Sequence, residues 1–487
     1  MCGIAGIVNF SREKIQPSEI KKVIRSVKHR GPDDDGYWQN FDKNILLINT
    51  RLSVQDLSKN GSQPMISEDN RYVIIFNGEI YNFKELKKNY LKNEFFLSNS
   101  DTEVILKLFI KHGHSFLKFL EGMFAIAIYD NKLKKLFLAR DEFGVKPLYY
   151  FCSKKKIIFS SEIKTFFKLN LKKKINLRSI SSYLTSEYYE NNFYTFYQDI
   201  QKIEPGHYLE ICDGKIKKKK YFYFHEFRKK IFIPKNYSER KEKLKYLIRR
   251  SVELGMVSDV PISIASSGGL DSSILQYEAN KQNKNISLIS WDFHEQHYSE
   301  KKFVKEISKI TNLESIFYKI KPQEIIKSIK NIISLNEEPF AGIPIISYYL
   351  TLKNINNNKV ILDGSGIDEA HAGYDKYFLT NSNYSKISQD GTLGVRNIIN
   401  DNFLKKNNNF DNEINYKNNF KNKMYNDIFF TKLPRALRFR DKISMSLGTE
   451  LRPVFLNKQL ISFLFNLKKN DHKNNGFSKY ILRDAYK

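Results

Sequence analysis

The second residue of this chain is the first that could perform chemistry. Cys2 follows the initiator methionine. Because cysteine is small, that methionine is normally removed, which would leave Cys2 with a free α-amine. An α-amine has a pKa of about 8, so it can take the proton of its own thiol and activate it as a nucleophile. Taken alone, the position is more typical of a buried structural cysteine.

Five short motifs accompany this cysteine in the first half of the chain. They are Cys-Gly-Ile-Ala-Gly at 2–6, His-Arg-Gly-Pro-Asp at 29–33, Arg-Leu-Ser at 51–53, Asn-Gly-Glu-Ile-Tyr-Asn at 77–82 and Ser-Asp-Thr-Glu at 100–103. In this order and spacing they resemble the class II glutamine amidotransferases, over residues 2–210. The resemblance implies an N-terminal-nucleophile fold and hydrolysis of glutamine at Cys2.

Charged residues of these motifs suit the two ends of a glutamine molecule. Arg51 can bind the α-carboxylate through its planar fork of N–H donors. Asp101, together with Glu79, can hold the α-ammonium. Taken singly, each could also be an ordinary surface charge, and it is their occurrence together that favours a glutamine site.

The thiol attack creates an oxyanion, which needs hydrogen-bond donors already in place. The resemblance implies that the Asn77 side chain and the Gly78 backbone N–H supply them, so that both act with Cys2 in catalysis. The set predicted to bind glutamine is Arg51, Leu52, Val54, Asn77, Gly78, Glu79 and Asp101.

A glycine-rich segment in the second half of the chain reads Ser-Gly-Gly-Leu-Asp-Ser-Ser at 267–273. Glycines let the backbone approach phosphates, and the start of a helix favours their charge. No Gly-Lys-Ser/Thr follows, so this is not a Walker loop. The segment resembles the pyrophosphate loop of ATP pyrophosphatases. That resemblance implies ATP binding by Ser266, Ser267, Gly268, Gly269, Asp271, Ser272, Asp363 and Gly364.

Later segments extend this second resemblance to the end of the chain. They lie at 363–369, 437–445 and 478–483. Together, the two halves resemble the glutamine-hydrolysing asparagine synthetases. This implies an acyl-adenylate of aspartate, ammonia that travels through an internal tunnel, and release of AMP and pyrophosphate. Asp271 would ligate Mg²⁺, a hard cation that prefers oxygen ligands, and Lys479 would stabilise the departing pyrophosphate or the tetrahedral intermediate.

The chain departs from the asparagine synthetases near the expected acceptor site. Ser365 stands where the family commonly has Glu or Gln, and serine is a poor general base. Asp368 or Glu369 could compensate for it. Gly-Ile-Pro at 342–344 replaces small polar residues, so fewer hydroxyls would hold the second carboxylate of aspartate. A different carboxylate, such as a uronic acid sugar used in surface polysaccharides, is therefore an alternative acceptor.

The chain ends at Lys487, eight residues past Lys479, where the family usually continues with further helices. This predicts a C-terminus that is truncated relative to the family. A non-catalytic glutamine-binding protein is a further alternative, for which Ser365 and the short end would speak. The complete set of glutaminase residues around Cys2 argues against that alternative.

The order of predicted elements indicates two domains of different class. Short strands are expected at 72–76, 124–129, 136–139 and 156–159, with helices at 18–27 and 101–111. After about residue 237, strands at 261–265, 286–291 and 360–362 alternate with helices at 238–253, from 272 and at 300–310. We therefore predict an α/β protein: an αββα glutaminase domain over 2–215 and a doubly wound, parallel-sheet ATP-pyrophosphatase domain over 235–487. An Asn- and Lys-rich stretch at 380–427 reads as a loosely ordered insertion.

The overall composition excludes several other classes of protein. The net charge is +28 in 487 residues, but the lysines are spread along the whole chain, which argues against a nucleic-acid surface. Three unpaired-looking cysteines fit a reducing cytoplasm, and no signal peptide or membrane span is visible. The expected partners are small molecules: glutamine, ATP and aspartate or another carboxylate. The sequence leaves the oligomeric state open, with a homodimer among the alternatives.

Overall fold

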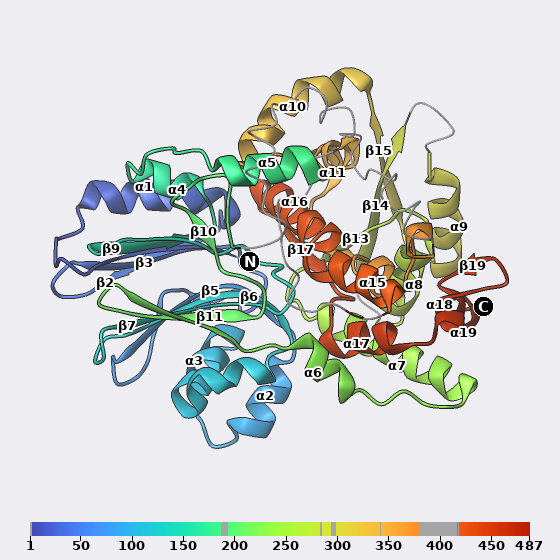
Figure 1. Ribbon diagram of the computed structural model, residues 1–487, viewed down its shortest axis with the longest axis horizontal. Coiled ribbons are helices and arrows are strands. Elements are labelled where there is room, and N and C mark those ends of the chain that lie inside the picture. Colours follow the sequence, from blue (N-terminus) through green and yellow to red (C-terminus); the bar gives the residue numbers. More distant parts are fainter. Residues whose placement is uncertain are drawn as a thin grey trace.

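The computed structural model describes residues 2–186, 193–282, 285–293, 299–340, 342–378, 416 and 418–487. These residues form two halves that lie side by side and are joined through α6 (Phe224–Lys229), as Figure 1 shows. Within the described part of the chain, none of the helices combines the length and apolarity needed to cross a membrane.

Two antiparallel sheets stacked on one another form the first half (Figure 1). The first sheet has the order β10-β8-β9-β1-β3-β2. Its strands are β1 (Cys2–Asn9), β2 (Asp34–Gln39), β3 (Ile45–Arg51), β8 (Tyr149–Cys152), β9 (Lys156–Ser160) and β10 (Gln201–Lys202). The second sheet has the order β12-β11-β7-β6-β5-β4. Its strands are β4 (Met65–Ile66), β5 (Tyr72–Ile80), β6 (Gly122–Asp130), β7 (Lys135–Arg140), β11 (His207–Cys212) and β12 (Lys215–Lys220).

The alternation of side chains along these strands explains the layers. Ile4 and Leu47 point between the two sheets, whereas Ile7 and Ile48 point outward and pack beneath helices. The outer face of the first sheet is covered by α1 (Pro17–Val27) and α4 (Lys164–Lys168), and that of the second by α2 (Phe83–Tyr90) and α3 (Asp101–His112). The predicted αββα arrangement is confirmed.

A five-stranded parallel sheet with the order β15-β14-β13-β16-β17 forms the second half. Its strands are β13 (Ile262–Ala265), β14 (Ile286–Phe293), β15 (Ser315–Ile320), β16 (Val360–Asp363) and β17 (Glu450–Pro453). The chain first builds outward from β13 to β15 and then returns to the other side of β13. The strand order therefore reverses between β13 and β16, and ligands of such sheets bind at the carboxyl ends of the strands beside that point.

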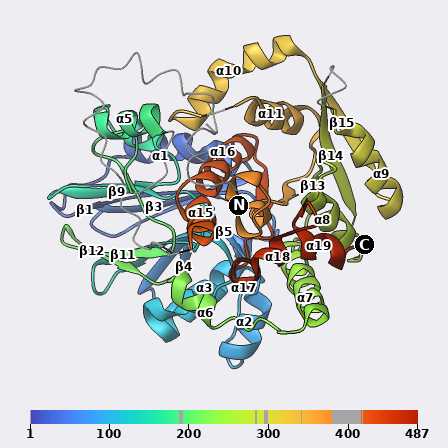
Figure 2. The ribbon, with the colours of Figure 1, turned by 45° about the vertical axis from the view of Figure 1, so that its right-hand side comes forward.

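Helices cover both faces of this sheet, because neighbouring strand residues point to opposite sides. Leu288 and Leu362 pack on one side and Ile289 and Ile361 on the other. Helices on the first side include α7 (Tyr237–Gly255), α8 (Leu270–Asn280) and α17 (Lys458–Asn466), and those on the second are α10 (Pro322–Asn336), α11 (Ile343–Ile355) and α16 (Lys432–Ser446). Further α-helices of the described residues are α5 (Leu177–Ser186), α9 (Lys301–Thr311), α12 (Ile367–Ala370), α15 (Asn419–Phe429), α18 (Lys469–His472) and α19 (Tyr480–Ala485). Figure 2 shows α16 between the two halves. The predicted doubly wound class is confirmed.

The prediction of a loosely ordered insertion at 380–427 is wrong at its C-terminal end. Residues 419–427 belong to α15, where Phe420, Met424 and Ile428 are buried at helical spacing. The high content of Asn and Lys concealed this apolar stripe. The rest of the predicted insertion, up to residue 415, lies outside the described residues.

Candidate active sites

Cys2 opens β1, a strand inside the first sheet, and its side chain is almost completely buried. Its backbone nitrogen lies 3.2 Å from Asn77 Oδ1, to which it donates. Burial raises the pKa of the Cys2 thiol, although contacts with the Leu52 backbone and the Asn49 side chain oppose the shift. The thiol therefore keeps its proton near neutral pH and needs a base before it can attack.

Arg51 lies directly opposite Cys2 in the pairing of β1 with β3. Backbone carbonyl groups hold its buried guanidinium: Nη1 donates to Ser58 O at 2.9 Å and Nη2 to Asp56 O. Gly61 lies so close that a Cβ there would come within 2.3 Å of Nη2. Among the described residues no carboxylate forms an ion pair with Arg51, so its charge is available to an anionic ligand.

Asp101 and Glu79 supply two carboxyl groups that are both buried. Asp101 begins α3, and its Oδ2 accepts the Ile80 N–H at 2.9 Å. Burial raises the pKa of Asp101 to about 6 and that of Glu79 well above its ordinary value. Glu79 Oε2 lies 3.2 Å from Arg452 Nη2, whereas Glu79 Oε1 has no hydrogen-bond partner in the part of the chain that the structure describes. Two buried carboxyls with raised pKa values favour the arrival of a further cation.

The remaining residues of the predicted glutaminase site are Asn77, Gly78, Leu52 and Val54. Because Asn77 Oδ1 accepts from Cys2, its Nδ2 is the group left to donate to an oxyanion, and Ser161 Oγ lies 3.5 Å from it. Gly78 packs against β6, where a Cβ would come within 2.1 Å of Met123 O. Leu52 and Val54 are buried in an apolar core that continues into the second half.

The predicted pyrophosphate loop follows β13 at the point where the strand order reverses. Gly268 has a φ of +66°, and a Cβ there would come within 2.5 Å of Phe303 Cβ. Gly269 N donates to Ser267 Oγ at 3.3 Å, and Ser272 Oγ donates to Gly269 O at 3.0 Å. These contacts hold the loop in a tight turn at the start of α8, which suits a polyphosphate.

Two residues of the predicted ATP set have particular positions. Ser266 is buried, its hydroxyl accepts from Gln276 Nε2 at 2.6 Å, and its backbone N–H donates to Ile289 O at 2.9 Å. Gly364 follows Asp363 at the end of β16 and lies beside Asp271. A Cβ added to Gly364 would lie 3.5 Å from the Cβ of Asp271. The two predicted ATP-binding segments are therefore neighbours in space.

Lys479 joins the loop to the second segment through two ion pairs. Its Nζ lies 2.7 Å from Asp271 Oδ2 and 2.6 Å from Asp368 Oδ1. Burial raises the pKa of Asp271 to about 6, although Lys479 opposes the shift. Sequence reasoning proposed Asp271 and Lys479 separately, and the fold brings them into contact.

Asp271 Oδ1 is buried and has no hydrogen-bond partner among the described residues. A free carboxylate oxygen of this kind fits a hard cation such as Mg²⁺, which proteins often hold through one or two carboxylates and substrate phosphates. Within the described part of the chain, no group of three or more His, Cys, Asp or Glu side chains is arranged around one point. The residues present therefore fit an ion that is shared with the nucleotide.

Arg440 of α16, which sequence reasoning did not single out, occupies the region of the first family departure. Its Nη1 lies 2.7 and 2.8 Å from the two carboxylate oxygens of Asp363 and also donates to Ser365 Oγ. Glu369 lies in the short helix α12, and burial raises its pKa to about 7. Tyr374 OH donates to Glu369 at 3.1 Å.

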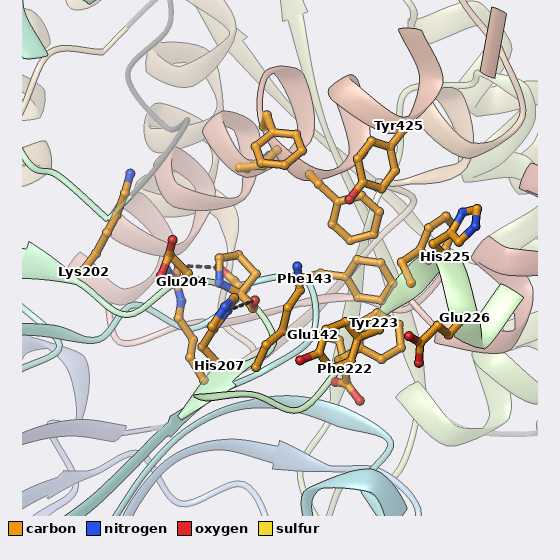
Figure 3. Close-up of a pocket in the computed structure, with 18 residues that line it drawn as sticks. Glu142, Phe143, Lys202, Glu204, His207, Phe222, Tyr223, His225, Glu226 and Tyr425 are labelled. Carbon is orange, nitrogen blue, oxygen red and sulfur yellow. Dashed lines mark hydrogen bonds between the residues drawn. The ribbon is translucent and has the colours of Figure 1, made fainter. Parts of the chain in front are cut away.

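A separate pocket lies where the two halves meet, and Figure 3 shows it. It encloses about 230 Å³, with the rings of Phe143, Phe222 and Tyr425 on its walls and Lys202 and Glu226 among its charged residues. None of the residues predicted for glutamine or ATP binding lines it.

Comparison with known proteins matches both halves of the chain. A family described as "Glutamine amidotransferase domain" matches residues 1–222, and one described as "Asparagine synthase" matches residues 243–487. Asparagine synthetase [glutamine-hydrolyzing] 1 of Bacillus subtilis (strain 168) is 34% identical over 385 residues, which are 77% of this chain and 59% of that protein. Asparagine synthetase [glutamine-hydrolyzing] 2 of the same organism is 34% identical over 401 residues, 77% of this chain and 52% of that protein.

The chain thus spans little more than half the length of these two relatives. Its two matched regions follow one another in the order of the two structural halves, and together they take in both predicted sites. On these matches, the chain belongs to the family of glutamine-hydrolysing asparagine synthetases.

Proposed function

We propose that this protein uses glutamine and ATP to convert aspartate to asparagine, with glutamate, AMP and pyrophosphate as the other products. The observation that carries the proposal is the set of charges near Cys2. The Arg51 guanidinium, which has no carboxylate partner among the described residues, and the buried carboxyls of Asp101 and Glu79 match the two charged ends of glutamine. Because the chain spans only part of its relatives, the whole reaction is a proposal for this protein.

The first reaction takes place at Cys2. Its α-amine accepts the thiol proton, and the sulfur attacks the side-chain amide carbon of glutamine. Asn77 Oδ1 holds that amine nitrogen, 3.2 Å away. The C–N bond then breaks, ammonia leaves with the proton, and water hydrolyses the thioester to glutamate. Asn77 Nδ2 and the Gly78 N–H stabilise the oxyanion of each step.

The second reaction takes place at the pyrophosphate loop. A carboxylate oxygen of aspartate attacks the α-phosphorus of ATP, and pyrophosphate leaves. The backbone of Gly268 and Gly269 and the start of α8 stabilise the phosphate charge, and Lys479 adds a cation. Asp271 would hold a magnesium ion, which would supply further neutralisation of the phosphate charge.

Ammonia then displaces AMP from the acyl-adenylate and must lose a proton. Ser365 has no carboxylate for this task, and the Arg440 guanidinium beside it stays protonated. Glu369, whose pKa burial raises to about 7, is the nearby carboxyl suited to accept the proton at neutral pH.

Replacing the nucleophile tests the first reaction. Cys2→Ala should abolish glutamine hydrolysis and glutamine-dependent pyrophosphate release, because no thiol remains to attack the amide. Ammonium chloride should still support pyrophosphate release, since the second site is unchanged. Glutamate formation and pyrophosphate are measured in parallel for both proteins. Undiminished glutamate formation by the variant would overturn the assignment of Cys2.

The acceptor is tested by pyrophosphate release with aspartate and with other carboxylates. The Ser365–Arg440 contact favours a second candidate, a different acceptor such as a uronic acid sugar, because a guanidinium replaces the family's general base beside Asp363. Aspartate should give pyrophosphate and asparagine in equal amounts. Release with a uronic acid and none with aspartate would replace the first acceptor by the second.

A further inference from the structure

A cluster of six charged side chains is buried where the two halves meet. It contains three cations and three carboxylates: Arg30, Lys146, Glu162, Glu337, Asp441 and Lys442. Even the most exposed of these side chains, Glu337, is only 6% exposed. Their charges balance, and each member is paired, which is the condition for burying ions at all. Arg30, Lys146 and Glu162 belong to the first half, with the two antiparallel sheets, called the glutaminase half below. Glu337, Asp441 and Lys442 belong to the second half, with the parallel sheet, called the ATP-binding half.

Arg30 is the member of this cluster that reaches the nucleophile. It lies in η1 (Lys28–Arg30) and is completely buried. Its Nε donates to the backbone oxygen of Cys2 at 3.3 Å. Its Nη1 donates to Glu162 at 2.7 Å and its Nη2 to Asp441 at 2.9 Å. One planar guanidinium therefore connects Cys2 to a residue 411 positions away from Arg30 in the chain.

Helix α16 holds the other end of this connection. Lys146 Nζ lies 3.3 Å from the second oxygen of Asp441. Lys442, the next residue of α16, lies 2.7 Å from Glu162 and 2.6 Å from Glu337. Both carboxylates that bind Arg30 are thus fixed by a second cation. Two fixed carboxylates therefore hold the guanidinium beside Cys2.

Cys2 depends on such contacts because it begins its strand. With the initiator methionine removed, no peptide bond precedes it, and Asn77 Oδ1 holds its nitrogen. Arg30 holds its backbone oxygen. The nitrogen that accepts the proton makes the first of these contacts, and the α-carbon that carries the side chain with the attacking thiol lies between the two. A displacement of about 1 Å in such a group lowers a reaction rate by up to about 100-fold.

We propose that Arg30 is a positioning residue for Cys2, and that Asp441 of the ATP-binding half sets the orientation of Arg30. Glutamine hydrolysis then requires the contact between α16 and the glutaminase half. This inference rests on the proposed role of Cys2 as the glutamine nucleophile. It adds a dependence of the first reaction on a residue of the other half.

The decisive variant is Asp441→Asn in the full chain. It keeps the size of the side chain but removes the charge that fixes Nη2 of Arg30. We expect kcat for glutamine hydrolysis to fall about 10-fold to 100-fold. KM for glutamine should change less than about twofold, because Arg51 and Asp101 are untouched. A purely structural role would instead lower the amount of folded enzyme and leave kcat per active site unchanged.

Active sites are counted with a diazoketone analogue of glutamine, which alkylates a glutaminase thiol covalently. Mass spectrometry of the N-terminal peptide gives the labelled fraction and its rate. The Asp441→Asn protein should reach the same final labelling as the unchanged protein, at a rate lower by about the same factor as kcat. Equal labelling rates in the two proteins would overturn the inference.

Two further variants separate positioning from a general loosening of the interface. Arg250 and Glu85 also join the two halves, 3.0 Å apart, yet touch neither Cys2 nor the cluster. Arg250→Gln should leave kcat unchanged, and an equal loss of kcat would contradict the inference. Arg30→Lys retains a cation and should keep more activity than Arg30→Met. If both Arg30 variants were as active as the unchanged protein, the inference would fail.

The outcome also distinguishes this inference from the proposed function. No labelling of Cys2 in the unchanged protein would refute the role of Cys2 as a glutamine nucleophile, and with it the first reaction. Labelling of the unchanged protein at the same rate as the Asp441→Asn protein would refute only the positioning by Asp441. Ammonia-dependent pyrophosphate release reports on the second site independently of both.

Discussion

The pKa of Asp101 links glutamine binding to pH. Burial raises this pKa to about 6, so the carboxyl is charged at pH 7 and becomes neutral as the pH falls through 6. The neutral form cannot balance the α-ammonium of glutamine. We therefore expect KM for glutamine to rise about tenfold between pH 7 and pH 5. Steady-state kinetics at constant ionic strength measure this. A KM that stays constant over this interval, or one that rises equally in Asp101→Asn, would contradict the assignment.

Residue types and spacing were enough to predict most of the residues proposed for the chemistry. They did not predict the residues that hold those side chains in place. Cys2, Arg51 and Asp101 stand in short motifs whose chemistry can be read from the sequence. The role of Arg30 could not be read, although it lies in one of those motifs, because its partner Asp441 comes from the other half of the fold. The raised pKa values were equally hidden, since they arise from burial and not from local sequence.

At the scale of an element, the turn after β13 depends on Gly268. Its φ of +66° disfavours a side chain, and a Cβ would meet Phe303 at 2.5 Å. Gly268→Ala should lower the free energy of unfolding by about 1–3 kcal/mol and reduce ATP-dependent pyrophosphate release more than tenfold. Glutamine hydrolysis should be retained.

Gly113→Ala is the matched control for this turn. Gly113 also has a positive φ, of +54°, but an added Cβ would have no atom within 4 Å. Urea denaturation and pyrophosphate release are compared for both variants. If Gly268→Ala and Gly113→Ala lost pyrophosphate release equally, the loss in Gly268→Ala would come from general backbone strain and not from a change in the loop.

Element prediction worked where periodicity was strong and failed where composition concealed it. The strand predicted at 72–76 lies within β5, and the helix predicted at 238–253 lies within α7. By contrast, α15 carries its apolar stripe in a stretch dominated by Asn and Lys, so composition suggested an insertion. The strand with which β12 pairs is not determined by the residues of β12 alone. The periodicity of side chains along a strand therefore does not predict its pairing partner.

At the scale of the whole molecule, Arg452 holds the two halves together from within. It is completely buried, with Nη2 3.2 Å from Glu79 and Nε 2.5 Å from Glu450. Its Nη1 also donates to Gly255 O at 2.8 Å. Arg452→Met would leave two carboxylates buried without their cation, so we expect the free energy of unfolding to fall by about 3–5 kcal/mol.

Denaturation in urea, followed by tryptophan fluorescence and circular dichroism, measures this loss. The control is Arg250→Gln, whose partner Glu85 is 47% exposed, and its loss should stay below about 1 kcal/mol. A loss of similar size in the two variants would show that the buried position of Arg452 adds nothing to the stability of the interface.

The position of Cys2 at the buried start of β1 also decides how this protein should be produced. Any extension that remains on its nitrogen turns the amine into an amide, which cannot accept the proton of the thiol. An N-terminal affinity tag should therefore yield a preparation that uses ammonia but not glutamine. Recombinant protein for these assays needs its tag at the carboxyl end, and intact-mass measurement should verify that the methionine has been processed.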